Sequence, residues 1–156
     1  MHVLGRVIAV NISAGGIPKR NVDACDVTLA GLRGDRHDHA KHDSPLQAVS
    51  LLDVEMIESL REDGFDLSPG ATGENVTLAD AHIQRCVVGD RVRFSGGLEI
   101  EITKVRKPCS VLDAIDPALR IASVGRIGML AKVLRPAPLA VGERVEVLRV
   151  DAVASR

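Results

Sequence analysis

Aromatic residues are almost absent from this chain of 156 residues, which has two phenylalanines and no tryptophan or tyrosine. The hydrophobic core must therefore be built from Val, Ile, Leu and Ala, since apolar residues still make up 46% of the sequence. The same shortage removes the rings on which unpaired bases stack, so single-stranded nucleic acid is excluded as an expected partner.

The sequence also lacks an excess of either positive or negative charge. Twenty basic residues face 21 acidic ones, for a formal net charge of −1, so no overall basic field attracts DNA or an anionic membrane surface. Long hydrophobic runs are also lacking: the first segment, "MHVLGRVIAVNIS", is too short and too interrupted by polar residues for a signal peptide or a membrane span. We expect a cytoplasmic protein with no nucleic-acid or membrane partner.

The sequence also lacks closely spaced pairs of cysteines. Cys25, Cys86 and Cys109 are widely spaced and odd in number. In a reducing compartment this indicates free thiols rather than a disulfide framework or a CxxC metal site.

The chain does contain many short segments rich in β-branched residues, separated by Gly, Pro and Asp. They lie at 2–12, 26–32, 48–52, 74–79, 90–95, 98–105, 128–134 and 143–150. This spacing is typical of a sandwich or barrel, and no helix follows each strand as a parallel doubly wound sheet would require. The related segments "VGDRVRF" and "VGERVEV" indicate one barrel turn used twice.

Helices are expected at only two places. One is residues 53–63, with Asp53 as N-cap and Gly64 as its stop; the other is residues 110–115, with Ser110 as N-cap. The sequence thus predicts a mainly β fold, a closed or partly closed β-barrel with a few short helices, forming a single domain over residues 1–156.

The stretch "VRKPCSVLDAI", residues 105–115, gives Cys109 unusual neighbours. Arg106 and Lys107 are cations, and a helix start follows; both features stabilise the thiolate, which is the reactive form of cysteine. The local sequence leaves two interpretations open, a reactive or metal-ligating thiol and a small buried side chain. Cys25 and Cys86 lack such neighbours and are interpreted as structural.

Three further segments could hold a ligand or could be ordinary loops. His37, His39 and His42 lie among aspartates in "GLRGDRHDHAKHD", a set that suits a first-row metal. The glycine-rich "GGIPKR" carries Lys19 and Arg20, and "GRIG" carries Arg126; these cations could bind phosphate or carboxylate.

Taken in order, these segments resemble the MOSC domain, the module named after the C-terminal part of molybdenum-cofactor sulfurase. The resemblance rests on "SAGGIPKR", "GLRGDRH", "AVSLLD", "LSPGATGENVTL", "VGDRVRF", "LEIEITKVRKPC", "GRIGMLAKVL" and "VGERVEV", and is closest to stand-alone bacterial members. One departure is the sequence His-Asp-Ser-Pro at 42–45, where the family usually has His-Gly-Gly-Pro. It restricts that loop and adds a carboxylate.

The resemblance implies a barrel of the pyruvate-kinase type and a pocket for the molybdenum cofactor (molybdopterin) or a sulfur-bearing group. Cys109 would then be the catalytic residue, carrying a persulfide or ligating molybdenum. The residues implied to bind the cofactor are Lys19, Arg20, Asn75, Lys107 and Pro108, to which the glycine context adds Arg126. We expect these cations to repel one another without an anion, and Lys19, Arg20 and Arg126 to share one pocket with Asn75 and Cys109.

Two mechanisms follow from the resemblance. As a sulfur transferase, the chain would take sulfur from a pyridoxal-phosphate-dependent donor, because no pyridoxal phosphate site fits within it, and pass it to a molybdoenzyme acceptor. As a molybdenum-dependent oxidoreductase component reducing N-hydroxylated compounds, it would need an external electron donor. The alternative from another class is a non-catalytic metal-binding module built on His37, His39 and His42.

Overall fold

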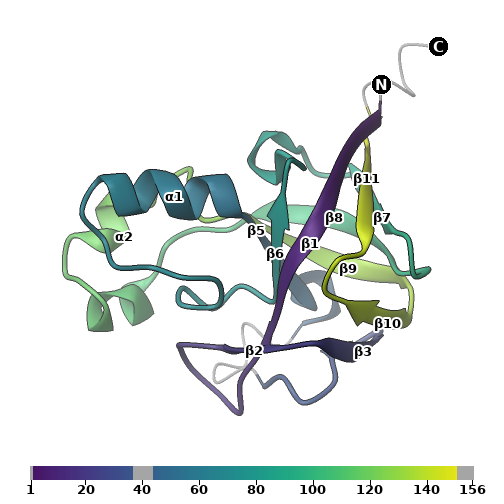
Figure 1. Ribbon diagram of the computed structural model, residues 1–156, viewed down its shortest axis with the longest axis horizontal. Helices are drawn as coiled ribbons and strands as arrows, with labels where there is room; N and C mark the ends of the chain where they lie inside the picture. Colours follow the sequence, from purple (N-terminus) through teal and green to yellow (C-terminus); the bar gives the residue numbers. More distant parts are fainter. Residues whose placement is uncertain (1, 37–43, 151–156) are drawn as a thin grey trace.

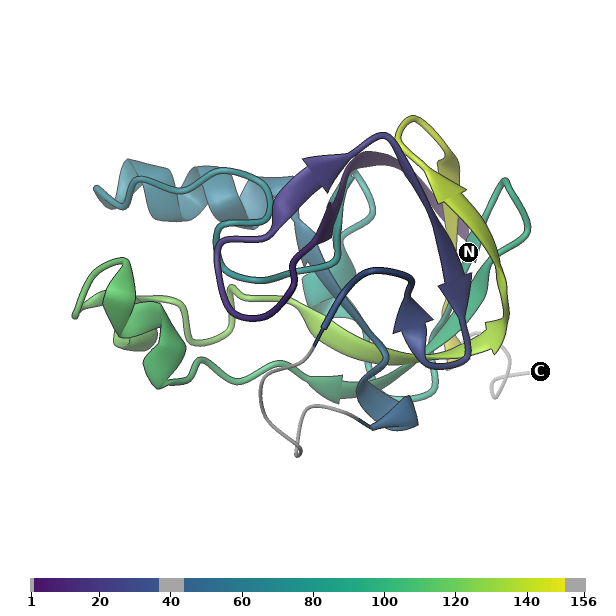
Figure 2. The same cartoon turned by 90° about the horizontal axis from the view of Figure 1, so that it is seen from below.

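The computed structural model describes residues 2–36 and 44–150. Eight strands form one sheet in the order β11-β7-β8-β9-β5-β6-β1-β2, and the pairing of β11 with β1 closes seven of them into a barrel. A smaller sheet, β10-β3-β4, lies at the lower end in the view of Figure 1, and Figure 2 shows the barrel as a ring of strands. The mainly β barrel expected from the sequence is confirmed.

The strands are antiparallel except for β5 and β6, which run parallel. Their bounds are β1 His2–Ile12, β2 Arg20–Val22, β3 Ala24–Thr28, β4 Gly31–Leu32, β5 Val49–Asp53, β6 Val76–Ala79, β7 Arg91–Phe94, β8 Glu99–Val105, β9 Met129–Arg135, β10 Ala137–Ala140 and β11 Arg144–Leu148. The helices are α1 Val54–Glu62 and α2 Leu119–Ala122, with short 3-10 helices at Pro45–Gln47 (η2), Ile83–Arg85 (η3) and Ser110–Ala114 (η4).

Two strands had no clear signal in the sequence. β2 is only three residues long, and β10 contains Pro138, which pairs with Asp26. Proline cannot donate to a ladder and is found on edge strands, and β10 is an edge of the smaller sheet.

The helix expected at residues 53–63 is confirmed as α1, and Ile57 and Leu60 of its apolar set are buried. Asp53 is its N-cap residue, but the carboxylate makes no capping bond there. It accepts instead from the backbone N–H groups of Ile83 and Gln84, each at 2.9 Å. Its burial raises the pKa of the Asp53 carboxyl above its ordinary value.

The second expected helix differs from the prediction. Residues 110–114 form a 3-10 helix, and its N-cap is Cys109 rather than Ser110. A separate short helix, α2, follows Pro117. Because the 3-10 helix is only five residues long, it supplies little of the dipole expected to favour a thiolate.

The protein has two apolar cores. One fills the barrel, and the other lies outside it, where Leu52 of β5 packs with Leu60 of α1, Leu112 of η4 and Leu119 of α2. Alternation along β5 directs Leu51 into the barrel and Leu52 into the outer core. The outer core therefore fixes the segment after Cys109 against the barrel.

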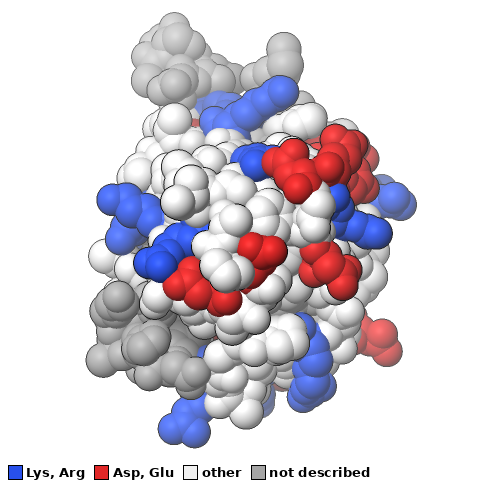
Figure 3. All heavy atoms as spheres, turned by 90° about the vertical axis from the view of Figure 1, so that its left-hand side faces the viewer, with Lys and Arg blue, Asp and Glu red and all other residues white. Residues whose placement is uncertain are grey.

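Helices α1 and α2, together with η4, gather at one end of the molecule, to the left of the barrel in Figure 1. On that face, basic and acidic side chains are interspersed around a broad uncharged area (Figure 3). In the described residues, no helix combines the length and apolar character that crossing a bilayer requires.

Candidate functional site

Cys109 lies where the chain leaves the barrel wall and enters the helical end. Strand β8 ends at Val105, and the backbone N–H of Arg106 still donates to the carbonyl of Gly128 at 3.1 Å. Cys109 itself has an extended backbone, is half-buried, and its carbonyl accepts from Leu112 N–H at 3.1 Å. The continuation of the ladder to residue 106 thus sets the direction of the Arg106 side chain just before the cysteine.

Arg106 is the main charged neighbour of Cys109. Its Nη2 donates to the carbonyl oxygen of Thr72, whereas its Nη1 is buried and has no hydrogen-bond partner among the described residues. Burial lowers the pKa of this guanidinium, and the nearby carboxylate of Glu74 and thiol of Cys109 act in the opposite direction. The guanidinium therefore lies near both a buried carboxylate and the thiol, and its Nη1 has no partner among the described residues.

Glu74 holds the loop on which this arrangement depends. Its buried carboxylate accepts from Gly70 N–H at 2.9 Å, from Thr72 Oγ1 at 3.0 Å and from Thr77 Oγ1 at 2.8 Å. These bonds tie the turn 70–74 to the start of β6. The Thr72 carbonyl that Arg106 contacts is thereby fixed.

Gly73 creates space between the cations. A Cβ placed on it would lie 3.0 Å from Ile17 Cγ2, 3.5 Å from Arg106 Nη2 and 4.0 Å from Lys19 Cε. Its φ is +98°, which side-chain-bearing residues rarely adopt. The segment "GATGENVT" therefore brings Lys19 and Arg106 to the same glycine.

Lys19 is already neutralised by the protein. Its Nζ lies 2.7 Å from both oxygens of Asp35, and only 8% and 2% of the two side chains are exposed. Asp35 also accepts from Ser13 N–H and from Asn75 Nδ2, each at 2.9 Å. The repulsion expected between unpaired cations is thus offset internally, by Asp35 for Lys19 and by Glu74 for Arg106.

Asn75 has a positioning role in this arrangement. Its Oδ1 accepts from Ser50 N–H at 3.0 Å, and its Nδ2 donates to Asp35 and to the Asn11 carbonyl. Both ends of the buried amide are occupied by protein groups. Asn75 therefore orients Asp35.

The remaining predicted residues lie in different settings. Arg20 is exposed on β2, Lys107 is exposed, and Pro108 is half-buried beside Cys109. Arg126 is placed elsewhere: its guanidinium binds the Ala122 carbonyl, Ser59 Oγ at 3.0 Å and Asp63 at 2.8 Å. The structure brings together Lys19, Asn75 and Cys109 with Arg106, but it directs the Arg126 guanidinium towards α1 and α2.

Burial distinguishes the other two thiols. It raises the pKa of Cys86 to about 12, and it also raises the pKa of Cys25. The Cys25 thiol donates to the backbone carbonyls of Asp26 and Arg33, at 3.3 and 3.2 Å. All three cysteines are free.

Sequence reasoning considered Arg106 only as a neighbour of Cys109 and did not select Glu74 at all. The predicted metal set His37, His39 and His42 lies outside the described residues. Within the described ranges, no group of three or more His, Cys, Asp or Glu side chains could hold a metal ion.

The chain also matches a known protein family and several solved structures. The family model of the MOSC domain matches residues 35–146, which is more than half of the sequence. The chain belongs to the MOSC domain family. This family is associated with molybdenum-cofactor binding or sulfur-related functions.

Solved structures share the fold of this MOSC domain. The YuaD protein of Bacillus subtilis superposes with a TM-score of 0.80 at 17% identity, covering 94% of this chain and 97% of that one. YiiM of Geobacillus stearothermophilus gives 0.75 at 20% identity, with 93% and 75% covered, and YiiM of Escherichia coli gives 0.65 at 22%, with 92% and 69%. Comparison with functionally curated proteins gives no significant match.

Proposed function

We propose that this MOSC domain handles sulfur or the molybdenum cofactor through Cys109. The observation that carries the proposal is the buried Arg106 guanidinium, which lies near the Cys109 thiol and keeps Nη1 without a partner among the described residues. A buried donor with no partner is costly. An anion at Cys109, whether a thiolate, a persulfide or an oxyanion group of a cofactor, would supply that partner.

The residues at the site suit the molybdenum cofactor. Cys109 offers a soft sulfur ligand, Arg106 offers a charged donor, and Gly73 leaves the space a side chain would fill. Lys19 and Arg20 are the candidates for the cofactor's phosphate; Lys19 would share its ammonium group with Asp35, whereas Arg20 is exposed. Lys107 and Pro108 lie in the cysteine loop. When bound, the cofactor would supply the redox chemistry of molybdenum, which no residue of the chain provides.

As a sulfur carrier, the site would act through its own thiol. The Cys109 thiolate attacks the outer sulfur of a persulfide on a pyridoxal-phosphate-dependent donor protein. A new S–S bond forms on Cys109 while the donor's S–S bond breaks, and the donor leaves as a thiolate. Arg106 stabilises the anion before and after transfer, and a molybdoenzyme is the proposed acceptor.

The sulfur carrier and the oxidoreductase component can be distinguished by what the purified protein contains. We expect protein from its native host to carry either sulfur released by cyanide as thiocyanate, or molybdenum with a fluorescent pterin. Cys109→Ser removes that content, whereas the matched variant Cys25→Ser retains it. Content that survives in Cys109→Ser would refute the proposal.

Each outcome favours one mechanism. Labile sulfur without metal supports the carrier. Molybdenum with pterin supports the oxidoreductase component, which then requires an electron donor and an assay with N-hydroxylated compounds. Stoichiometric zinc that is lost in His39→Ala and kept in Cys109→Ser would instead support the metal-binding module.

A further inference from the structure

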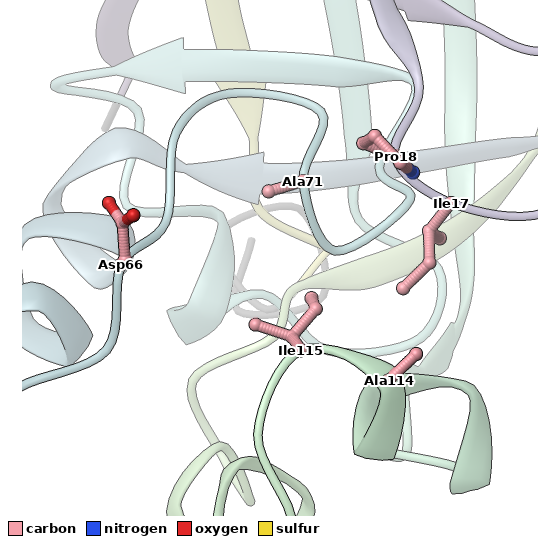
Figure 4. A pocket seen from close by; sticks show the side chains of 6 residues that line it. All are labelled: Ile17, Pro18, Asp66, Ala71, Ala114 and Ile115. Atoms are coloured by element: carbon pink, nitrogen blue, oxygen red, sulfur yellow. The ribbon is translucent and has the colours of Figure 1, made fainter.

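A hollow of about 190 Å³ lies beside η4, the 3-10 helix that follows Cys109 in the sequence (Figure 4). Three segments far apart in sequence form it: the loop between β1 and β2, the loop after α1, and η4 with the residue that follows. Its lining residues are Ile17, Pro18, Asp66, Ala71, Ala114 and Ile115. In Figure 4, Asp66 stands at one end and Ile17 with Pro18 at the other.

The hollow and the Cys109 site share walls. The Cβ position of Gly73 lies 3.0 Å from Ile17 Cγ2 and 3.5 Å from Arg106 Nη2, so Ile17, which lines the hollow, and Arg106 both flank Gly73. Ala71 directly precedes Thr72, whose carbonyl binds Arg106. A molecule in the hollow would thus lie about one side chain away from the Arg106 guanidinium.

The volume limits the occupant. A dry cavity of about 150 Å³ accepts a benzene ring, and drug-sized ligands occupy about 300–1,000 Å³. A hollow of about 190 Å³ therefore suits one ring or an equivalent apolar body with a short polar arm. Ile17, Ala71 and Ile115 supply apolar walls for such a body.

Asp66 supplies the charge at one end. Its carboxylate is exposed, and no hydrogen bond or ion pair to it exists among the described residues. An ionised carboxylate accepts most strongly from a charged donor and repels an anion. The polar arm that fits this end is therefore a protonated amine.

We infer that this hollow binds a small organic ammonium compound, with its apolar body between Ile17 and Ile115 and its ammonium group on Asp66. Binding itself does not require Cys109. The assignment of the hollow as the substrate site of this MOSC domain rests on the proposed function.

The test compares benzylamine with benzyl alcohol, a neutral probe of the same shape, titrated into the full chain and followed by saturation-transfer NMR. We expect benzylamine to bind about twofold to fivefold more tightly, as one exposed charge pair allows. Asp66→Asn is expected to abolish this preference. Ala114→Leu, which fills the hollow, is expected to weaken both probes at least about fivefold.

Ala118→Leu is the matched control, because Ala118 is also exposed but does not line the hollow; it is expected to bind as the parent does. Cys109→Ser is expected to retain benzylamine binding, so failure of the Cys109 proposal and failure of this inference give different results. Equal affinity for the two probes, or a preference that persists in Asp66→Asn, would overturn the inference. So would binding unchanged in Ala114→Leu.

Discussion

At the scale of single residues, the site is a balanced set of charges around one thiol. Lys19 is paired with Asp35, and Arg106 lies near both Glu74 and Cys109. Formation of a Cys109 anion would therefore add one negative charge to a set that is otherwise neutral. Arg106 is the member with a free buried donor to receive it.

Thiol reactivity follows from these settings. At pH 8, a thiol with a pKa of about 12 is ionised in only about one molecule in 10⁴, so Cys86 should resist iodoacetamide until strongly alkaline pH. Burial also raises the pKa of Cys25. We expect Cys109 to be alkylated first, by about tenfold or more relative to Cys86, because it is half-exposed and the pKa values of the other two thiols are raised.

Mass spectrometry at each cysteine across a pH series measures this order. Arg106→Met should slow alkylation of Cys109 and leave Cys25 unchanged. If Cys109 is alkylated no faster than Cys86 in the parent chain, its role is structural rather than reactive.

The Arg106–Glu74 interaction can be measured by a double-mutant cycle. Arg106→Met removes the charged donor to the Thr72 carbonyl and the positive neighbour of the buried Glu74 carboxylate, at an expected cost of about 1.5–3 kcal/mol in the free energy of unfolding. Adding Glu74→Gln removes the unpaired charge. The double variant should therefore lose about 1–3 kcal/mol less than the sum of the single changes, as measured by urea denaturation. Additive losses would show that the two groups do not interact.

At the scale of elements, the glycines of the turn "GRIG" have a different role from the one expected from the sequence. The glycines that drew attention to Arg126 serve the junction between α2 and β9. Gly128 has a φ of +93°, and a Cβ there would overlap the Leu51 carbonyl of β5. Gly125 has a φ of +74°, and a Cβ there would meet nothing within 4 Å.

These two glycines form a matched pair for a stability measurement. Gly125→Ala should cost about 1–2 kcal/mol, the strain of a left-handed backbone alone. Gly128→Ala adds a clash between the new Cβ and the Leu51 carbonyl of β5 and should cost more than about 3 kcal/mol. Thermal and urea unfolding of both variants checks this difference. Equal losses in the free energy of unfolding would show that the close approach of Gly128 to β5 does not affect stability.

At the scale of the whole molecule, the barrel and the helical end differ in how they are held. Seven strands share a closed ladder, whereas η4 depends on the outer core through Leu112. Elements with few cooperative hydrogen bonds open at lower free energy than the barrel.

Native-state hydrogen exchange should reveal that difference. Amides of Ile100 and Ala131, in the paired strands β8 and β9, should exchange only through global unfolding. Amides of Leu112 and Ile115, which close the 3-10 turn after Cys109, should exchange at least about 100-fold faster. Equal protection in both regions would show that the Cys109 segment unfolds only with the barrel.

The sequence by itself determined most of the strands and the barrel class, and it directed attention to the segment around Cys109. Alternating apolar residues define strand faces locally, and β-branched residues with glycine turns exclude a helical fold, so β1, β8 and α1 followed from local pattern. The same local reasoning failed at β10, where proline obscures an edge strand, and at residues 110–114, where a 3-10 turn replaced the expected helix.

Only the tertiary structure decided which groups meet at Cys109. Glu74 and Arg106 are 32 positions apart, and the hollow is lined by residues from 17 to 115. Their proximity follows from barrel closure and the outer core, neither of which is encoded in any short motif. The charge balance of the site also depends on the tertiary structure, because Lys19 is neutralised by Asp35 only once the β1–β2 loop and the segment after β4 are folded against each other. The local sequence indicated Arg106 as a neighbour of Cys109, but only long-range packing decided that Arg106 also meets Glu74 and Thr72 and that Arg126 lies against Asp63 instead.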